Sequence, residues 1–471
     1  MIEWLHNNLL LLASLKAFGI SVILTPILRD VFRSYNVVDQ PGLRRVHVYP
    51  IPRIGGIPIA VAYAVALYTF SGESVGLGGP VMKLLPGAGM IFLTGLVDDF
   101  FNLRPVVKLI GQIVAALLVF WSGLSISTLG SNNTLPFWLD LPLTVFWLLL
   151  TTNALNLIDG LDGLCAGIGM VATLALLGAA LLYGNQPLAY ATMPLACALA
   201  GFLCYNINPA TVFLGDSGAL LIGFLLGCYG MIWTQKTSTL LSLLVPIIAL
   251  SVPLLDVSVA VFRRLLRRQP IFGADRAHIH HRLLDRGLTP KRAVLVLFLF
   301  AATAAGLALL LIAPQVARFR NVVLVLLLVA IWLGLRELRY KEFNFLGRMV
   351  FGGEWQQSLQ ETLRLDHLTA SLAAAQTQAE WWMAIAETAR ACEWTSLQWT
   401  HARGTHELVI STEEPSWKFL VSLSEHGSLA VGGNSGRSGM DLTEFAAVIQ
   451  RSVHGRSFDE ERSEVHETPS G

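Results

Sequence analysis

The sequence predicts an all-α polytopic membrane protein with about eleven transmembrane helices, followed by a small C-terminal α+β cytoplasmic domain. Of its 471 residues, 54% are hydrophobic and 14% are charged, whereas soluble proteins carry about 25% charged residues. Apolar stretches long enough to cross a bilayer recur up to residue 337. We therefore expect a transmembrane domain at residues 1–340, an accessory domain at 341–455 and a disordered tail at 456–471.

Eleven apolar stretches approach the length of about 20 residues that a transmembrane helix needs. They lie near residues 8–28, 54–71, 80–97, 107–124, 136–153, 164–183, 188–205, 213–233, 240–262, 293–313 and 321–337. With the N-terminus outside, the external loops contain only Lys83, Lys236, Arg318 and Arg320. The arginine-rich segments all fall on the other side. Because cytoplasmic loops are enriched in Lys and Arg, this asymmetry predicts an external N-terminus and a cytoplasmic C-terminus.

The C-terminal region differs in character from the rest of the chain. Residues 354–390 are polar with apolar side chains at helical spacing, and the segments SLQWTH, HELVIST, WKFLVSLS and SLAVGG alternate as strands do. A further helix is expected near Asp441 to Val453. These residues form no evident catalytic constellation, so the predicted topology assigns all the polar motifs with chemical potential to the cytoplasmic loops of the membrane domain.

The segment NALNLIDGLDG, residues 153–163, separates two of the apolar stretches. It carries two carboxamides, Asn153 and Asn156, and two carboxylates, Asp159 and Asp162. Acids beside membrane spans are costly and usually functional, and the glycines allow a tight turn or a close approach to a ligand. A polar helix cap between two spans is the alternative interpretation.

Asp98 and Asp99 end another apolar stretch, and Lys108 and Gln112 follow on the next expected helix. Because Lys108 and Gln112 are four residues apart, they share one helical face. Paired acids beside a lysine suit a phosphate and its metal, and one acid could accept a proton from an attacking phosphate. An interfacial ion pair that caps a helix is also compatible with this motif.

Asp216 lies between Gly215 and Gly218 at the start of a further apolar stretch. A carboxylate beside the free backbone amides of a helix start is a suitable anchor for magnesium and a diphosphate. A helix N-cap is the alternative. Asn206 and Asn208, just upstream, could add carboxamide contacts.

Two basic clusters occur in the predicted cytoplasmic loops. One consists of Arg276, His278, His280, His281 and Arg282, and the other of Arg44, Arg45, His47 and Arg53. Imidazole and guanidinium donors in the first cluster suit a nucleotide diphosphate, with a zinc site or attraction to anionic lipid as alternatives. The second cluster could bind a phosphorylated lipid or a nucleotide, or serve only to fix the topology.

Together these motifs place five acids and two basic clusters on one side of the bilayer. Oxygen ligands with phosphates favour Mg²⁺ or Mn²⁺, and phosphoryl transfer needs little beyond positioning and charge neutralisation. A site open to both cytosol and bilayer suggests one soluble and one lipid substrate. The net charge of +1 indicates no nucleic-acid partner.

Four motifs in order, LVDDFFNLRPVVK, NALNLIDGLDGLCAG, PATVFLGDSGALLIGF and ADRAHIHHRLLDRG, resemble those of the polyprenyl-phosphate N-acetylhexosamine-1-phosphate transferases. The resemblance covers about residues 35–292. It implies a multi-pass enzyme of the bacterial cytoplasmic membrane that moves a sugar-1-phosphate from a UDP-N-acetylhexosamine to undecaprenyl phosphate. It also implies release of UMP, a requirement for Mg²⁺ or Mn²⁺, and the lipid bilayer as surroundings, and it leaves a homodimer open.

The resemblance also implies roles for individual residues. Asp98, Asp99, Asp159 and Asp162 would form the catalytic set, in which Asp98 handles and deprotonates the lipid phosphate, and Asp216 would be the metal ligand. Taken with the motifs above, the predicted substrate-binding residues are Arg44, His47, Arg53, Lys108, Asn153, Asn156, Asn206, Arg276, His278, His280, His281 and Arg282. Direct attack by the lipid phosphate is favoured over an aspartyl-phosphate intermediate, because the carboxylates then remain free to bind the metal ion and to accept protons.

Within this family, the HIHH and PRIGG segments resemble the branch that uses UDP-GlcNAc to begin teichoic acid, O-antigen or common-antigen synthesis. Ile279 interrupts the run of three histidines usual in the peptidoglycan branch. The competing hypotheses are a polyprenyl-lipid transporter or flippase and an inactive scaffold of the same fold. The acids lie at one end of the spans, unlike mid-membrane transport sites, and the presence of every expected acid argues against the scaffold.

Overall fold

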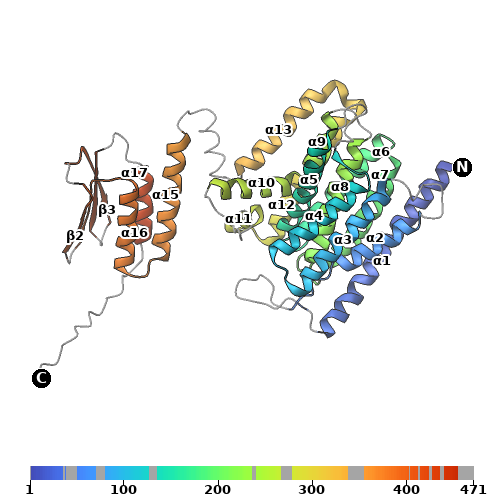
Figure 1. Cartoon of the computed structure of the whole chain (residues 1–471), viewed down its shortest axis with the longest axis horizontal. Coiled ribbons are helices and arrows are strands. Elements are labelled where there is room, and N and C mark those ends of the chain that lie inside the picture. The colour runs from blue at the N-terminus through green and yellow to red at the C-terminus, as the bar shows by residue number, and fades with distance from the viewer. Residues whose placement is uncertain are drawn as a thin grey trace. The chain divides into compact units, whose positions relative to one another are not determined.

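The computed structural model describes residues 2–35, 38, 50–70, 80–126, 135–235, 240–266, 278–337, 355–401, 404–411, 414–423, 427–434 and 440–453. The chain divides into two compact units, Met1–Arg339 and Tyr340–Gly471 (Figure 1). The predicted site residues Arg44, His47 and Arg276 lie outside the described residues, as do Arg45 and the expected tail at 456–471.

The first unit is a bundle of helices (Figure 1). They are α1 (Ile2–Ser34), α2 (Gly56–Tyr68), α3 (Pro80–Phe101), α4 (Pro105–Trp121), α5 (Phe137–Ile158), α6 (Leu164–Leu182), α7 (Gln186–Asn206), α8 (Gly215–Gln235), α9 (Leu240–Ala249), α10 (Ser251–Leu266), α11 (Ile279–Asp285), α12 (Pro290–Ile312), the 3₁₀ helix η2 (Pro314–Phe319) and α13 (Arg320–Glu337). Helices therefore occur in each of the eleven predicted regions.

The predicted count of about eleven transmembrane helices is not confirmed. Among the described residues, seven helices are long and apolar enough to cross a membrane: α1, α3, α5, α6, α7, α8 and α12. Helices α2 and α4 are also apolar but shorter, with 13 and 17 residues. The predicted span 240–262 is divided at Leu250 into α9 and α10. The chain is thus a multi-pass membrane protein, with seven candidate spans among its described residues.

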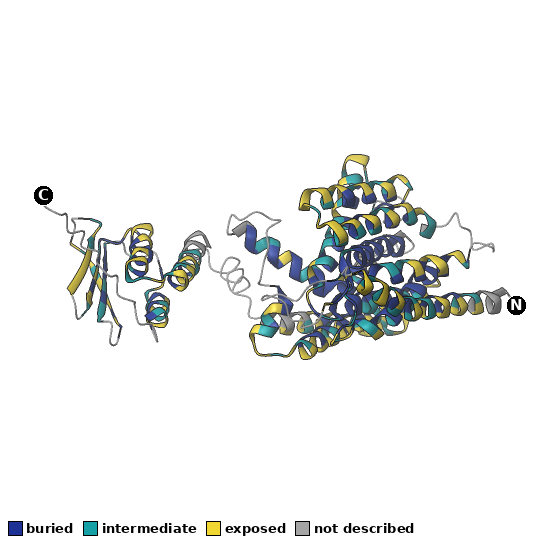
Figure 2. Cartoon of the chain, turned by 90° about the horizontal axis from the view of Figure 1, so that it is seen from below, coloured by how far each residue is buried: buried dark blue, intermediate teal, exposed yellow. Residues whose placement is uncertain are grey.

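Helix α8 forms the centre of the bundle, because its candidate span is completely buried. It packs against α2, α3, α5 and α6, and Figure 2 shows buried residues concentrated in the middle of the unit. Glycines allow the close approach: a Cβ at Gly95 of α3 would lie 2.5 Å from the Ser217 Cα atom of α8. Small residues at helix contacts are typical of membrane bundles, where backbones pack closely.

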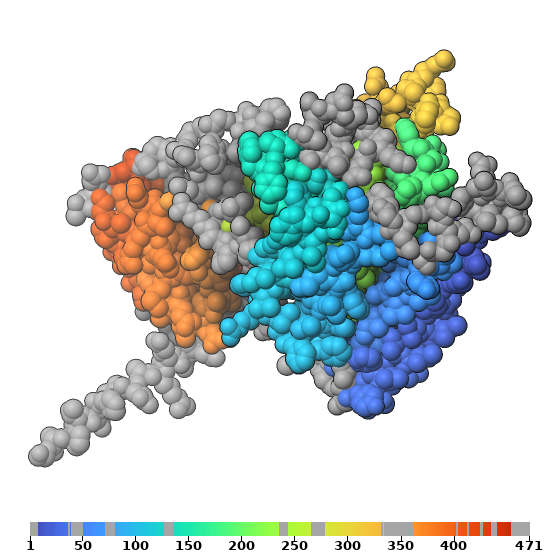
Figure 3. All heavy atoms as spheres, turned by 45° about the vertical axis from the view of Figure 1, so that its right-hand side comes forward, coloured from blue at the N-terminus to red at the C-terminus, as the bar shows by residue number. Residues whose placement is uncertain are grey.

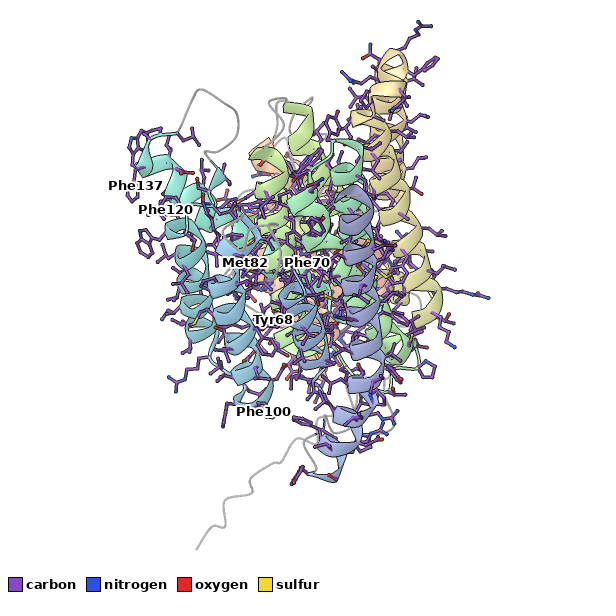
Figure 4. All side chains as sticks on the ribbon, turned by 90° about the vertical axis from the view of Figure 1, so that its right-hand side faces the viewer. Tyr68, Phe70, Met82, Phe100, Phe120 and Phe137 are labelled. Carbon is purple, nitrogen blue, oxygen red and sulfur yellow. The ribbon has the colours of Figure 1, made fainter. Side chains whose placement is uncertain are left out.

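The periphery of the bundle is apolar and aromatic, as expected for a surface in contact with lipid. The surface of α1 to α4, blue to cyan, dominates one face in Figure 3. Phe100 of α3 packs on Phe32 with ring centroids 6.0 Å apart, whereas Phe120 of α4 packs on Phe137 of α5 at 5.9 Å. Phe100 and the Phe120–Phe137 pair lie at opposite ends of the bundle (Figure 4), so aromatic side chains occur near both ends.

The second unit contains α15 (Trp355–Ala374), α16 (Gln378–Ala391), β1 (Ser396–His401), β2 (Gly404–Val409), β3 (Trp417–Ser422), β4 (Ser428–Gly433) and α17 (Leu442–Val453). The strands form an antiparallel sheet in the order β2-β1-β4-β3, and the three helices lie on one side of it (Figure 1). Trp381, Leu397 and Phe445 are fully buried between the helices and the sheet. The predicted helices and strands of this α+β domain are confirmed.

Candidate active site

Lys108 of α4 lies at the centre of the candidate site. Its Nζ donates to Asp98 Oδ2 at 3.0 Å and to Asn156 Oδ1 at 3.2 Å, and it pairs with Asp216 Oδ2. Asn156 Nδ2 donates to Asp216 Oδ1 at 2.8 Å. These four residues, here named the Lys108 cluster, join the ends of α3 and α5 to the starts of α4 and α8. The structure thus brings together sequence motifs separated by up to 118 positions.

The two carboxylates of the Lys108 cluster differ in access. The Asp98 side chain is 10% exposed and that of Lys108 is 16% exposed, whereas Asp216 is 32% exposed. Asp98 is also held by the Leu103 backbone N–H, which donates to its Oδ1 at 2.6 Å. Two carboxylates against one ammonium leave the cluster with one excess negative charge. Asp216 is therefore the carboxylate most open to a metal ion or a substrate.

Asp99 has different hydrogen-bond partners from its neighbour Asp98. Its carboxylate accepts hydrogen bonds from the backbone N–H groups of Asp216 at 2.7 Å and Ser217 at 3.0 Å. Gly215 has φ +74°, and a Cβ there would lie 2.8 Å from the Asp99 carboxylate oxygens. The sequence suggested that these amides of α8 are free or capped by Asp216. Instead, Asp99 occupies these amides and Asp216 faces Lys108, while the role of Asp216 as a metal ligand stays a prediction.

A second contact between α4 and α5 lies one helical turn from Lys108. Gln112 Nε2 donates to Asn153 Oδ1 at 3.2 Å, and Asn153 Nδ2 donates to Gln112 Oε1 at 2.7 Å. Lys108 and Gln112 therefore share one face of α4, as their spacing predicts. Asn153 and Asn156 lie in the last turns of α5, although the sequence placed them in a loop. The reciprocal amide pair fixes the register of the two helices beneath the Lys108 cluster.

The loop that follows α5 is tied to the loop that precedes α8. Asp162 Oδ2 accepts from Asn208 Nδ2 at 2.9 Å and from the Ala210 N–H at 3.0 Å. Asn206 Oδ1 accepts from the Gly163 N–H at 3.1 Å, and Asn206 Nδ2 donates to the Val212 carbonyl at 2.9 Å. Both polar atoms of the buried Asn206 side chain are thus engaged within the protein. In this structure Asp162 and Asn206 hold two loops together, while their catalytic and substrate-binding roles stay predictions.

Asp159 lies in the same loop and is partly buried. Burial, followed by the charges of Asp216 and Asp99, raises the pKa of Asp159 to about 8, against the opposing effect of Arg53. Arg53 is held close by backbone pairing of its segment with Phe213, whose carbonyl accepts from the Gly55 N–H at 2.9 Å. At neutral pH Asp159 is therefore mainly protonated and can donate a hydrogen bond, unlike an ionised carboxylate.

The three predicted histidines occupy different environments. His278 and His280 are 6% and 2% exposed, their rings are parallel within 3°, and their centroids lie 5.9 Å apart, whereas His281 is exposed. Burial, followed by the neighbouring His281, lowers the pKa of His280 to about 4. His280 is thus neutral at pH 7 and would contact a phosphate through a neutral imidazole N–H, so its substrate-binding role stays a prediction. Within the described residues no three His, Cys, Asp or Glu groups form a metal cluster, so the zinc alternative is not supported.

The sequence interpretation missed Asp256 of α10. Its carboxylate is 2% exposed, contacts His278 Nδ1 at 3.1 Å and accepts from the Ile279 N–H at 2.9 Å. The sequence feature that could have identified Asp256 is its position as an acid within the apolar run LSVPLLDVSVAVF, inside the predicted span 240–262. An ionisable residue inside an apolar segment is a functional candidate by default.

Close packing connects His280 to the loop at Asp159. A Cβ placed on Gly160 would lie 2.3 Å from His280 Nε2, so only glycine permits this approach without displacement of the ring. The sequence predicted that the glycines of this motif allow either a turn or a close approach. Gly163 adopts φ +78° and serves the turn, while Gly160 serves the approach.

Comparison with known proteins places these residues in a recognised pattern. The pattern of the family described as glycosyl transferase family 4 matches residues 81–234, from α3 to α8. The chain is 34% identical over 286 residues to a probable undecaprenyl-phosphate N-acetylglucosaminyl 1-phosphate transferase of Bacillus subtilis strain 168, covering 59% of this chain and 78% of that protein. The matched family segment includes the whole Lys108 cluster.

Two further relatives show the range of the similarity. A decaprenyl-phosphate N-acetylglucosaminephosphotransferase of Mycolicibacterium smegmatis is 33% identical over 63% of this chain and 80% of that protein. An undecaprenyl-phosphate alpha-N-acetylglucosaminyl 1-phosphate transferase of Escherichia coli K12 is 31% identical over 60% of this chain and 78% of that protein. All three names specify a polyprenyl phosphate and N-acetylglucosamine, and the length of the lipid differs among them.

Proposed function

Because the chain belongs to glycosyl transferase family 4, we propose that it transfers N-acetylglucosamine-1-phosphate from UDP-GlcNAc to undecaprenyl phosphate. The products are undecaprenyl-diphosphate-GlcNAc and UMP. The observation that carries this proposal is the Lys108 cluster, in which an ammonium, two carboxylates and a carboxamide converge at the ends of four helices. Such a site can bind a phosphate, accept its proton and hold a divalent cation.

The reaction forms one phosphorus–oxygen bond and breaks another. An oxygen of the lipid phosphate attacks the phosphorus that carries the sugar, and the bond from that phosphorus to the UMP oxygen breaks. We assign binding of the anionic phosphate to Lys108 and acceptance of its proton to Asp98, whose carboxylate is oriented by the Leu103 N–H and Lys108. Since no carboxylate needs to become phosphorylated, Asp216 stays available throughout. This mechanism is the direct displacement that the sequence analysis favours over an aspartyl-phosphate intermediate.

The donor atoms of the cluster fit Mg²⁺ or Mn²⁺. Carboxylate and carboxamide oxygens of Asp98, Asn156 and Asp216 surround the Lys108 ammonium, and no sulfur or imidazole ligand lies among these contacts. Magnesium is commonly held by one or two carboxylates together with substrate phosphates and water, which matches the partly exposed Asp216. The ion would neutralise the diphosphate charge, with Asp216 as its principal protein ligand.

The proposed reaction also implies an orientation in the membrane. UDP-sugars are cytoplasmic, so the end of the bundle that carries the Lys108 cluster would face the cytosol, with the N-terminus outside. The arginine distribution favours the same arrangement. The lipid phosphate would reach the cluster from the bilayer past the apolar surface of α3 and α4, where Val97, Val107 and Ile110 are exposed.

The full-length protein in membranes, supplied with UDP-[¹⁴C]GlcNAc, undecaprenyl phosphate and Mg²⁺, is expected to produce labelled lipid and an equal amount of UMP. Removal of divalent cations with EDTA should abolish both products, and Mg²⁺ or Mn²⁺ should restore them. Parallel reactions with UDP-GalNAc, UDP-MurNAc-pentapeptide and decaprenyl phosphate would define both substrates. Folded protein that releases no UMP from any of these donors would contradict the proposed function.

Gly160→Ala is expected to lower transfer roughly 10- to 100-fold, because His280 must move to admit the new methyl group and small displacements in a site are costly. The matched control is Gly89→Ala, since a Cβ at Gly89 of α3 would meet no atom within 4 Å. Initial rates of UMP release for the two variants provide the comparison. Equal rates would show that the contact between His280 and Gly160 does not matter for turnover.

A further inference from the structure

We propose that Asp256 is a positioning residue that fixes the tautomer and orientation of His278, and through it the stacked His278–His280 pair beside Gly160. The effect on turnover rests on the proposed function, whereas the tautomer of His278 can be tested without it. Asp256, His278 and His280 lie beyond the family segment 81–234, which contributes Gly160 to this arrangement.

The placement of Asp256 points to a specific use. It lies within α10, between apolar residues, and its side chain is 2% exposed. A carboxylate in such surroundings is unfavourable unless both oxygens find partners. Here both do: Oδ1 accepts from the Ile279 N–H at 2.9 Å, and Oδ2 contacts His278 Nδ1 at 3.1 Å. One side chain therefore holds both the backbone at the start of α11 and the ring that precedes it.

The chemistry of the contact determines the proton on His278. We assign the hydrogen of this contact to Nδ1 of His278, because an ionised carboxylate only accepts hydrogen bonds. In a neutral imidazole, Nε2 is then the acceptor, which leaves that nitrogen for a donor group or a proton. Carboxylates behind a functional histidine fix its tautomer and ring orientation in this way in many sites.

The effect can reach the reaction site through packing. The rings of His278 and His280 are parallel, with centroids 5.9 Å apart. His280 Nε2 lies so close to Gly160 that a Cβ on this glycine would be only 2.3 Å away. Gly160 follows Asp159 in the chain. Rotation of His278 would therefore disturb His280 and the loop that carries Asp159.

Asp256→Asn is the sharpest test, because it preserves size and the acceptor for the Ile279 N–H but presents an amide donor to His278. The amide would require an unprotonated Nδ1, the reverse of the wild-type state. We expect ¹⁵N NMR of the full-length protein to show Nδ1 of His278 protonated in the wild type and unprotonated in the variant, with assignment by comparison with His278→Ala. Wild-type protein with unprotonated Nδ1 would overturn the proposal, whether or not any variant folds.

The kinetic arm measures transfer and its dependence on His278. We expect kcat to fall roughly 10- to 100-fold in Asp256→Asn, the range usual for residues that orient a functional histidine, and no further fall when Asp256→Asn is added to His278→Ala. Asp140→Asn, which removes another buried carboxylate at 7% exposure, controls for a general loss of stability. Activity of Asp256→Asn within twofold of wild type, or an additive loss in the double variant, would contradict positioning through His278. Absence of activity in the wild type would instead contradict the proposed function.

Discussion

Asp216→Asn is expected to reduce sugar-phosphate transfer roughly 100- to 1000-fold, which is typical when a preorganised electrostatic group is lost from a reaction site. The variant removes a charge that pairs with Lys108 and accepts from Asn156 Nδ2. It also introduces an amide N–H₂ group among existing donors, so at least one donor loses its acceptor. If Asp216 holds the metal, the residual activity should require a higher Mg²⁺ concentration than the wild type.

The matched control for Asp216→Asn is Asp140→Asn in the first turn of α5. Asp140 precedes Asn156 by 16 positions on the same helix, which corresponds to about 24 Å along the axis. It tests removal of a buried acid far from the Lys108 cluster. Initial rates over a Mg²⁺ series, with thermal unfolding in detergent, separate catalysis from folding. Near-normal turnover and an unchanged Mg²⁺ requirement in Asp216→Asn would refute the metal assignment.

Lys108→Met should abolish detectable transfer and also lower the unfolding temperature. It leaves Asp98 and Asp216 without their shared cation, and removing one partner of a fully buried pair costs about 3–5 kcal/mol. Because the three side chains are 10–32% exposed, water screens the remaining charges and we expect a smaller loss of about 1–2 kcal/mol. The loss of stability comes from the two unpaired carboxylates, whereas the loss of transfer comes from the missing ammonium that would bind the phosphate.

A second substitution distinguishes the stability effect from the catalytic effect. Asp98→Asn added to Lys108→Met removes one unpaired charge, so part of the lost unfolding temperature should return while activity stays absent. The control is Lys83→Met, at an exposed position near the other end of α3, which should change neither property. If the double variant is no more stable than Lys108→Met alone, repulsion between the two acids is not what destabilises the site.

Local sequence patterns were sufficient to predict most elements of this fold. Apolar length located helices in all eleven regions, and alternation located the four strands of the C-terminal unit, because both signals depend on neighbouring residues. The spacing of Lys108 and Gln112 correctly predicted a shared face, and the structure adds that this face contacts α5. The division of 240–262 into α9 and α10 was missed, since apolar composition alone does not show where a helix is interrupted.

The roles of adjacent acids could not be predicted in the same way. Asp98 and Asp99 are consecutive, yet one contacts Lys108 and the other binds the start of α8. Consecutive residues of a helix point about 100° apart, so their partners depend on which helices lie on each side. The same reason hid the contact between Asp256 and His278, which are 22 positions apart and joined only by the packing of α10 and α11.

The adjacency of Asp98 and Asp99 has a mechanical consequence. Asp98 forms an ion pair with Lys108 of α4, and Asp99 accepts a hydrogen bond from the Asp216 N–H of α8. The end of α3 is therefore bound to both α4 and α8. Any shift of α3 would carry Lys108 and Asp216 along with it and preserve their mutual spacing. The catalytic groups would then form one rigid unit. The two substrates, rather than the protein, would move to bring phosphorus and oxygen together.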